Sequence, residues 1–351
     1  MNIKANTVLV GMVVLLLAVI CFSLFVGAYS VPASDIIKSF KAALVSSGKS
    51  QDELIGVNTF LLFQIRLPRI LLSGITGAGL AITGAAIQGL FRNPLADPSL
   101  IGITNGAMLF AVFALVMMGS IMAFIPEFLQ QSVVAIFAFG GSIISTYIVY
   151  FLSQRGGKTF VVTMLLAGIA LSALAAAVSG IFIYLSDEQQ LRDITFWTLG
   201  SFSGASWGQL FIAAPVILLG SFALDRFSVS LNAILLGENE AEYLGVDVEK
   251  VKSGIILLTS LVVGVCIAMS GIIGFVGLII PHFIRILKGA DYRFLMKASA
   301  LGGAIFMILA DDLARTIIAP AELPIGILSA LIGGPFFLWL LMRTNQERLM
   351  I

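Results

Sequence analysis

Residues 66–107 read RLPRILLSGITGAGLAITGAAIQGLFRNPLADPSLIGITNGA, and this stretch decides the fold. Its first part is an apolar run of about 20 residues, the length of helix that crosses the hydrocarbon core of a bilayer. Arginines and a proline begin the stretch, and a turn with two further prolines follows the run. Gly77, Ala81, Ala85 and Gly89 recur every four residues, so one face of the predicted helix carries only small side chains. Because lipid gives helices no hydrophobic drive to associate, such a face predicts close helix packing.

The composition of the whole chain places it in a membrane. Of the 351 residues, 59% are hydrophobic and 11% are charged, and the mean hydropathy is +1.06. These values exclude an ordinary water-soluble domain and predict an all-α polytopic membrane protein. The net charge of +1 gives no indication of nucleic-acid binding. Cys21 and Cys266 both lie inside apolar runs, which gives little support to a disulfide or a cysteine metal site.

The apolar runs predict ten membrane-spanning helices in a single transmembrane domain, residues 1–351. A signal peptide is an alternative interpretation of the first run, but its apolar region is longer than a signal peptide requires, so an uncleaved helix is favoured. The predicted spans are residues 7–28, 67–90, 99–119, 128–152, 161–185, 206–224, 252–269, 272–287, 295–312 and 325–342.

The distribution of lysine and arginine predicts the orientation, because basic loops tend to stay in the cytoplasm. With both termini inside, 13 basic residues lie on the cytoplasmic side and 7 on the outer side. The inner set is Lys4, Arg92, Arg155, Lys158, Arg226, Lys250, Lys252, Arg285, Lys288, Arg293, Lys297, Arg343 and Arg348. The outer set is Lys38, Lys41, Lys49, Arg66, Arg69, Arg192 and Arg315.

Three of the outer residues, Arg66, Arg69 and Arg315, lie at helix ends against the topological bias, which indicates a use for positive charge there. Asp311 and Asp312 lie four and three residues before Arg315, and the spacing predicts local ion pairs with it. Charged residues are absent from the middle of the spans, which weakens an interpretation as a proton- or ion-coupled secondary transporter.

Two polar segments interrupt the apolar pattern. The turn FRNPLADPS at 91–99 contains prolines that end helices and polar side chains that cap them. Residues 225–252 form the longest polar segment of the inner side, and residues 238–244 read as a short helix with acidic residues in its first turn and Gly245 as its stop. Two short helices with exposed apolar residues within 232–246 favour a docking site for a partner protein. Gln88 and Asn105, inside spans, line a pathway or make helix-to-helix hydrogen bonds.

The chain shows no enzyme motif. GGKT at 156–159 resembles the end of a phosphate-binding loop, but the glycine that such a loop requires five residues before Gly157 is Leu152. His282 is the only histidine, and a lone imidazole is a poor metal or acid-base site. The sequence therefore predicts no catalytic residue, no metal site and no ATPase site in this chain.

Five motifs, taken together and in order, resemble the FecCD-type permeases of binding-protein-dependent ABC importers, which take up ferric siderophores, haem and vitamin B12. They are RLPR at 66–69, GLFRNPLADPSLIGITNGA at 89–107, GENEAEYLG at 237–245, GIIGFVGLIIPHFIR at 271–285 and AELPIGILSALIGGPFFLWLL at 321–341. The resemblance implies a type II ABC importer permease of about ten helices in the cell membrane, that is, the inner membrane if the source is Gram-negative. It also implies a two-fold dimer with a second copy or a sister permease, two ATPase subunits that use ATP and Mg²⁺, and an extracytoplasmic substrate-binding protein.

The resemblance also implies roles for individual residues. Arg66, Arg69 and Arg315 correspond to arginines that meet acidic residues of the binding protein, and as exposed pairs they would contribute only about 0–1 kcal/mol each. The coupling helices that contact the ATPase correspond to Leu235, Leu236, Glu238, Ala241, Tyr243, Leu244 and Gly245. The cytoplasmic gate corresponds to Asn93, Leu95, Val161, Val162 and Leu166, and Gln88 is added as a pathway candidate.

The resemblance predicts that the chain binds no cofactor itself and imports an iron chelate by alternating access. A ferric siderophore is the first expectation for the cargo, followed by haem and cobalamin. The alternatives are an ion-coupled secondary transporter and a structural membrane subunit of a larger enzyme.

Overall fold

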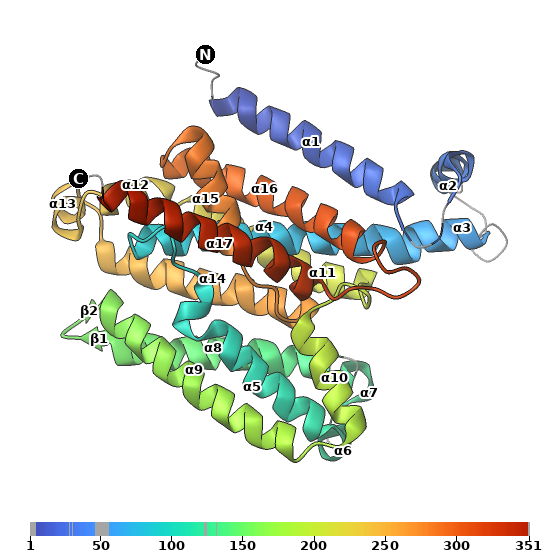
Figure 1. Cartoon of the computed structure of the whole chain (residues 1–351), viewed down its shortest axis with the longest axis horizontal. Coiled ribbons are helices and arrows are strands. Elements are labelled where there is room, and N and C mark those ends of the chain that lie inside the picture. Colours follow the sequence, from blue (N-terminus) through green and yellow to red (C-terminus); the bar gives the residue numbers. More distant parts are fainter. Residues whose placement is uncertain are drawn as a thin grey trace.

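The structure, a computed structural model, describes residues 5–27, 29, 31–45, 56–122, 125–130 and 132–349. Apart from one short hairpin, the regular elements are helices, which confirms the all-α fold (Figure 1). In order they are α1 (Ala5–Phe25), α2 (Ala33–Val45), α3 (Val57–Phe60), the π-helix η2 (Leu61–Arg66), α4 (Leu67–Leu90), the 3₁₀ helix η3 (Pro98–Ile101), α5 (Ile103–Val116), α6 (Met118–Ile121), α7 (Glu127–Gln130), α8 (Val133–Ser153), β1 (Gln154–Arg155), β2 (Lys158–Thr159), α9 (Val161–Tyr184), α10 (Glu188–Leu199), α11 (Trp207–Asp225), α12 (Ser228–Ile234), α13 (Glu238–Tyr243), α14 (Val248–Ser270), α15 (Val276–Lys288), α16 (Tyr292–Ala314) and α17 (Ile325–Leu349).

Each predicted span coincides with a helix, but the helices differ in length. Seven helical stretches are long and apolar enough to cross a membrane, and residues 103–116 and 325–340 form shorter apolar helices. The predicted span at 272–287 corresponds to α15, whose 13 residues extend about 20 Å at 1.5 Å per residue. That length is less than the hydrocarbon thickness. The number of crossings therefore stays a prediction.

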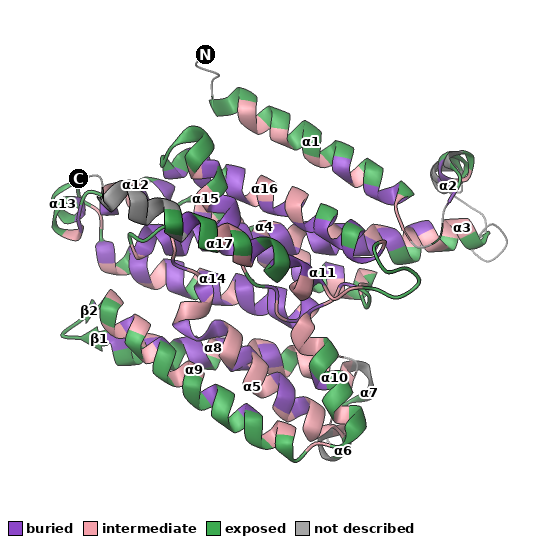
Figure 2. Ribbon diagram, viewed as in Figure 1, coloured by how far each residue is buried: buried purple, intermediate pink, exposed green. Residues whose placement is uncertain are grey.

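The glycine-rich helix α4 lies at the centre of the molecule. Figure 2 shows it almost entirely buried, whereas α1 is largely exposed. A side chain at Gly77 would collide with the backbone of Gly303 in α16, and one at Gly84 with the backbone of Gly277 in α15. The Gly77 contact confirms close packing along the predicted seam of α4, whereas Gly84 lies outside the four-residue repeat and packs against a second helix.

The chain between α14 and α15 is not helical, although it is buried in part. Gly271 and Phe275 have positive φ angles of 71° and 69°, so α15 begins at Val276 and not near residue 272 as the sequence predicts. The Ser201 amide donates to the Ser270 carbonyl oxygen at 2.8 Å. Irregular backbone is tolerated at membrane depth where protein groups satisfy it in this way.

The helices lie roughly parallel and expose two distinct ends (Figure 1). One end carries α12, α13 and the hairpin β1–β2, together with the first turn of α1 and the last turns of α17. The other end carries α2, α3, α6, α7 and α10. Helix α10 is a surface helix that the sequence analysis missed, although Asp187 and Gln190 form a capping box that marks its start. Lys4 and Lys49, used in the charge count, lie outside the described residues, and the orientation stays a prediction.

Candidate functional site

The three arginines predicted to dock a partner converge at the end of the molecule opposite α13, but they are buried. The exposed fractions of Arg66, Arg69 and Arg315 are 4%, 7% and 5%. Arg69 donates from Nε and Nη2 to the two carboxylate oxygens of Asp311, at 2.8 and 2.9 Å, and from Nη1 to Glu322 at 2.8 Å. The expectation of exposed arginines is therefore wrong for this structure, because all three are buried, and Arg69 and Arg315 are already paired with carboxylates of the same chain.

The other two arginines tie α1 to the same cluster. Arg315 donates to Asp312, to the carbonyl oxygen of Ser23 and to the Ser23 hydroxyl. Arg66 donates to the carbonyl oxygen of Leu24 at 2.6 Å and to that of Tyr29. Here α1, α4 and α16 are held by hydrogen bonds that involve charged groups, a class stronger than neutral hydrogen bonds.

Asp311 and Asp312 pair with different arginines. The predicted pair between Asp312 and Arg315 is present. The predicted pair between Asp311 and Arg315 is wrong, because Asp311 faces Arg69 on a different helix. Of the acidic groups in this cluster only Glu322 is partly exposed, with a side-chain exposure of 38%. The docking role of the arginines stays a prediction, and Glu322 is the part of the cluster that a partner can reach.

The predicted coupling segment folds as two short helices at the opposite end. Helix α13 covers Glu238–Tyr243, and Gly245 ends it with a φ of 83°, as the sequence predicts. Leu236, Tyr243 and Leu244 are 68%, 91% and 65% exposed. Large apolar side chains that stay exposed next to each other mark an interaction surface.

The remaining coupling residues form the base of this surface. Ala241 is fully buried, Leu235 is 40% exposed, and the Glu238 carboxylate pairs with Lys252 at 2.7 Å. Helix α12 packs beneath through Leu231 and Ile234, which are buried. A rigid base therefore presents the exposed residues of α13.

The predicted gate residues lie near the same end but do not form one cluster. The Asn93 side chain is exposed and accepts a hydrogen bond from the Leu95 amide at 2.9 Å, so it stabilises its own turn. Val162 and Leu166 are 70% and 63% exposed on α9, and Val161 is half-buried. No observation assigns these residues to a gate, and that role stays a prediction.

Gln88 is a structural residue in this conformation. It is buried, and its amide nitrogen lies 3.2 and 3.3 Å from the carbonyl oxygens of Gly277 and Leu278. Arg285 donates to the Gln88 side-chain oxygen at 2.9 Å. Of the two interpretations offered by the sequence, these contacts favour the helix-to-helix hydrogen bond. Asn105 is half-buried on α5.

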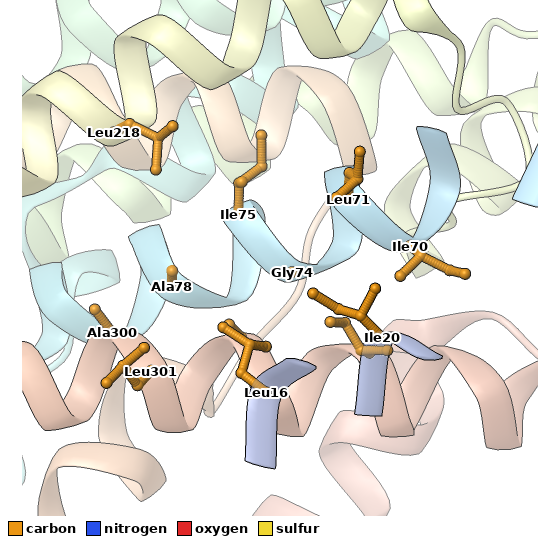
Figure 3. Close-up of a pocket in the computed structure, with 12 residues that line it drawn as sticks. Leu16, Ile20, Ile70, Leu71, Gly74, Ile75, Ala78, Leu218, Ala300 and Leu301 are labelled. Atoms are coloured by element: carbon orange, nitrogen blue, oxygen red, sulfur yellow. The ribbon is translucent and has the colours of Figure 1, made fainter. Parts of the chain in front are cut away.

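An apolar cavity of about 260 Å³ lies between α1, α4, α11 and α16 (Figure 3). Its lining is aliphatic or glycine throughout, and includes Leu16, Ile20, Leu71 and Leu218. A small-molecule site needs a few placed polar groups to orient its ligand. This cavity has none, so it does not suit a polar metal chelate.

GGKT at 156–159, rejected above as a phosphate-binding loop, is the turn of a β-hairpin. Gly156 and Gly157 both have positive φ, 58° and 76°, as a two-residue hairpin turn requires. The strands pair Gln154 with Thr159 and Arg155 with Lys158. His282 lies edge-on to Phe336 with ring centroids 6.1 Å apart.

The chain resembles known membrane permeases along most of its length. The family model described as the FecCD transport family matches residues 15–343. The hemin transport system permease protein HmuU of Yersinia pestis is 45% identical over 284 residues, which are 81% of this chain and 84% of that protein. The cobalamin import system permease protein BtuC of Halobacterium salinarum is 39% identical over 277 residues, which are 79% of this chain and 72% of that protein.

A solved structure has the same fold. It is described as an inward-facing conformation of a metal-chelate type ABC transporter, and it superimposes with a TM-score of 0.80 at 34% sequence identity. The match covers 96% of this chain and 99% of the solved chain.

Proposed function

The chain belongs to the FecCD transport family of ABC-importer permeases, and on that premise we propose that it carries a metal chelate into the cytoplasm by ATP-driven alternating access. The observation that carries the proposal is the exposed surface of α13, where Tyr243 and Leu244 project from a buried base. An ATPase that binds this surface can transmit the closure of its nucleotide sites to the permease.

The proposed assembly has five chains. Two permease copies, or this chain and a sister permease, enclose one path in the cell membrane. Two ATPase subunits bind on the cytoplasmic side and use ATP and Mg²⁺, while this chain binds no cofactor of its own. A substrate-binding protein docks on the outer side, at the surface around Glu322. The exposed apolar face of α9, with Val162, Leu166 and Ile169, supports a contact with lipid or with the second permease.

We propose an iron chelate or a corrinoid as the cargo. A ferric siderophore is the first expectation from the sequence. The names of the relatives support hemin and cobalamin instead, so these two metal-centred macrocycles are the first cargoes to test.

An ion-coupled secondary transporter is the rival function. Such a protein needs titratable groups on its pathway. In the described part of the spans the buried carboxylates Asp311 and Asp312 are paired with arginines near the end of α16. This pairing favours the ABC permease over the rival.

Reconstitution tests the proposal. The permease is placed in liposomes with its ATPase subunit, and the binding protein is added outside with labelled hemin or cobalamin. Uptake that requires internal ATP and both partners is expected. Uptake by this chain alone, driven by a proton or sodium gradient, would overturn the proposal.

A further inference from the structure

We infer that Lys252 is a positioning residue that links the coupling helix α13 to α9, the helix that carries predicted gate residues, an inference that rests on the proposed function. Lys252 lies on the second turn of α14 and is 2% exposed. A lysine is almost never buried to this degree unless it is paired. Its partners come from three separate segments.

The ammonium group of Lys252 makes three hydrogen bonds. It donates to the Glu238 carboxylate of α13 at 2.7 Å, to Glu249 on its own helix at 3.1 Å, and to the carbonyl oxygen of Thr159 at 3.0 Å. An ammonium group has three donors. All three are therefore used, and their directions fix the relative positions of α13, α14 and the hairpin.

The backbone of Thr159 makes two hydrogen bonds to side chains of α14. The Thr159 amide donates to the second oxygen of Glu249 at 2.9 Å, while the Thr159 carbonyl oxygen accepts from Lys252. Thr159 ends β2, and α9 begins two residues later at Val161. The hairpin is thus attached to α14 by its backbone, immediately before the helix that carries the predicted gate residues.

This arrangement gives a continuous path of contacts from the partner surface to α9. Tyr243 and Leu244 are exposed at one end of α13, and Glu238 at its other end bonds Lys252. A displacement of α13 must then move Thr159 and the first turn of α9, or break charge-assisted hydrogen bonds within a partly buried site. Such bonds are the strong ones, so movement of α9 is the expected result.

The test compares Lys252→Met with Lys250→Met in the complete transporter. Lys250 lies on the same helix but is exposed, with a side-chain exposure of 85%, and among the described residues its ion pair is with Asp247. ATP hydrolysed per molecule of hemin transported is measured in liposomes that contain the permease, its ATPase and the binding protein. Lys252→Met is expected to raise this ratio by about fivefold or more, the lower limit of typical coupling between sites. Lys250→Met is expected to leave it unchanged.

Two further variants separate linkage from stability. Glu238→Gln weakens the contact with α13 alone, because an amide oxygen is neutral, and Glu249→Gln weakens the contact with the hairpin, so each is expected to raise the ratio. Combining Glu238→Gln with Lys252→Met should add little, because both variants act on the same link. The single variants Glu238→Gln and Glu249→Gln remain informative if the Lys252→Met permease does not assemble.

The outcomes are distinct. If Lys252→Met and Glu238→Gln lower thermal stability but keep the wild-type ratio of ATP to hemin, Lys252 only stabilises the fold and the inference is overturned. If the wild-type complex shows no ATP-dependent uptake of hemin or cobalamin, the proposed function fails instead.

Discussion

Neutralising the buried pair of Arg69 and Asp311 should destabilise the permease far more than neutralising an exposed pair. The two side chains are 8% and 3% exposed and share two hydrogen bonds of 2.8 and 2.9 Å. Removing one partner of such a pair leaves a buried charge uncompensated and costs about 3–5 kcal/mol. The exposed pair of Arg293 and Asp291, with side-chain exposures of 67% and 46%, should contribute about 0–1 kcal/mol.

The structure also predicts which of the two single substitutions costs more stability. After Asp311→Asn the Arg69 guanidinium keeps Glu322 at 2.8 Å, so the loss should fall near the lower limit, about 3 kcal/mol. After Arg69→Met the Asp311 carboxylate has no other ion pair among the described residues, so the loss should approach about 5 kcal/mol. The double variant should lose less than the sum, because it leaves neither member of the pair charged.

The assay is reversible SDS unfolding of the detergent-solubilised permease, which gives the free energy of unfolding for each variant. Arg293→Met is the control, since Asp291 keeps its hydrogen bonds to Asn232 and to the backbone of residue 293. A difference of less than about 1 kcal/mol between Arg69→Met and Arg293→Met would refute the reasoning, because it would place the Arg69 pair in the class of solvated pairs.

Three further predictions concern the outer surface, the coupling surface and the packing seam. Glu322→Ala frees Arg69 Nη1 for a carboxylate of the binding protein, so docking should become severalfold tighter in surface plasmon resonance; unchanged affinity would contradict docking through Arg69. Tyr243→Ala with Leu244→Ala should reduce co-purification of the ATPase while the unfolding midpoint stays constant, because both side chains are exposed; full ATPase recovery would place the coupling surface elsewhere. Gly77→Ala should cost about 1–3 kcal/mol of unfolding free energy by overpacking against Gly303. Gly140→Ala is the control and should cause no such loss, because the space around Gly140 is open. Equal losses of unfolding free energy for the two variants would show that the α4–α16 seam can adjust.

The features that the sequence predicts correctly depend on local spacing. Four-residue repeats of small residues gave the seam of α4, and Gly245 marked the end of α13. The partner of Arg69 has no local signal, since Asp311 lies 242 positions away and Glu322 lies 253 positions away. Their spacing in the sequence predicts that Asp311 and Asp312 both pair with Arg315, but in the structure Asp312 pairs with Arg315 and Asp311 pairs with Arg69.

Lys252 could have been found from helical periodicity. The buried positions of α14 near its start include Val248, Val251 and Ile255, and Lys252 falls on the same face. Lys250, two residues earlier, falls on the opposite, exposed face. A lysine on the apolar face of a helix implies a buried partner, but only the fold identifies Glu238 and Thr159 as those partners.

The two charge clusters lie at opposite ends of the bundle and constrain different helices. The Arg69 cluster holds α1, α4 and α16 together at the predicted outer end, whereas the Lys252 cluster joins α13, α14 and the hairpin before α9 at the other end. Helix α14 packs against α8 on one side and against α4 and α11 on the other. A displacement of α13 is therefore expected to shift α9 and α14 relative to α1, α4 and α16, which the Arg69 cluster holds together. Gly264 faces Ser142 where α14 meets α8, and such small residues let the two helices approach closely.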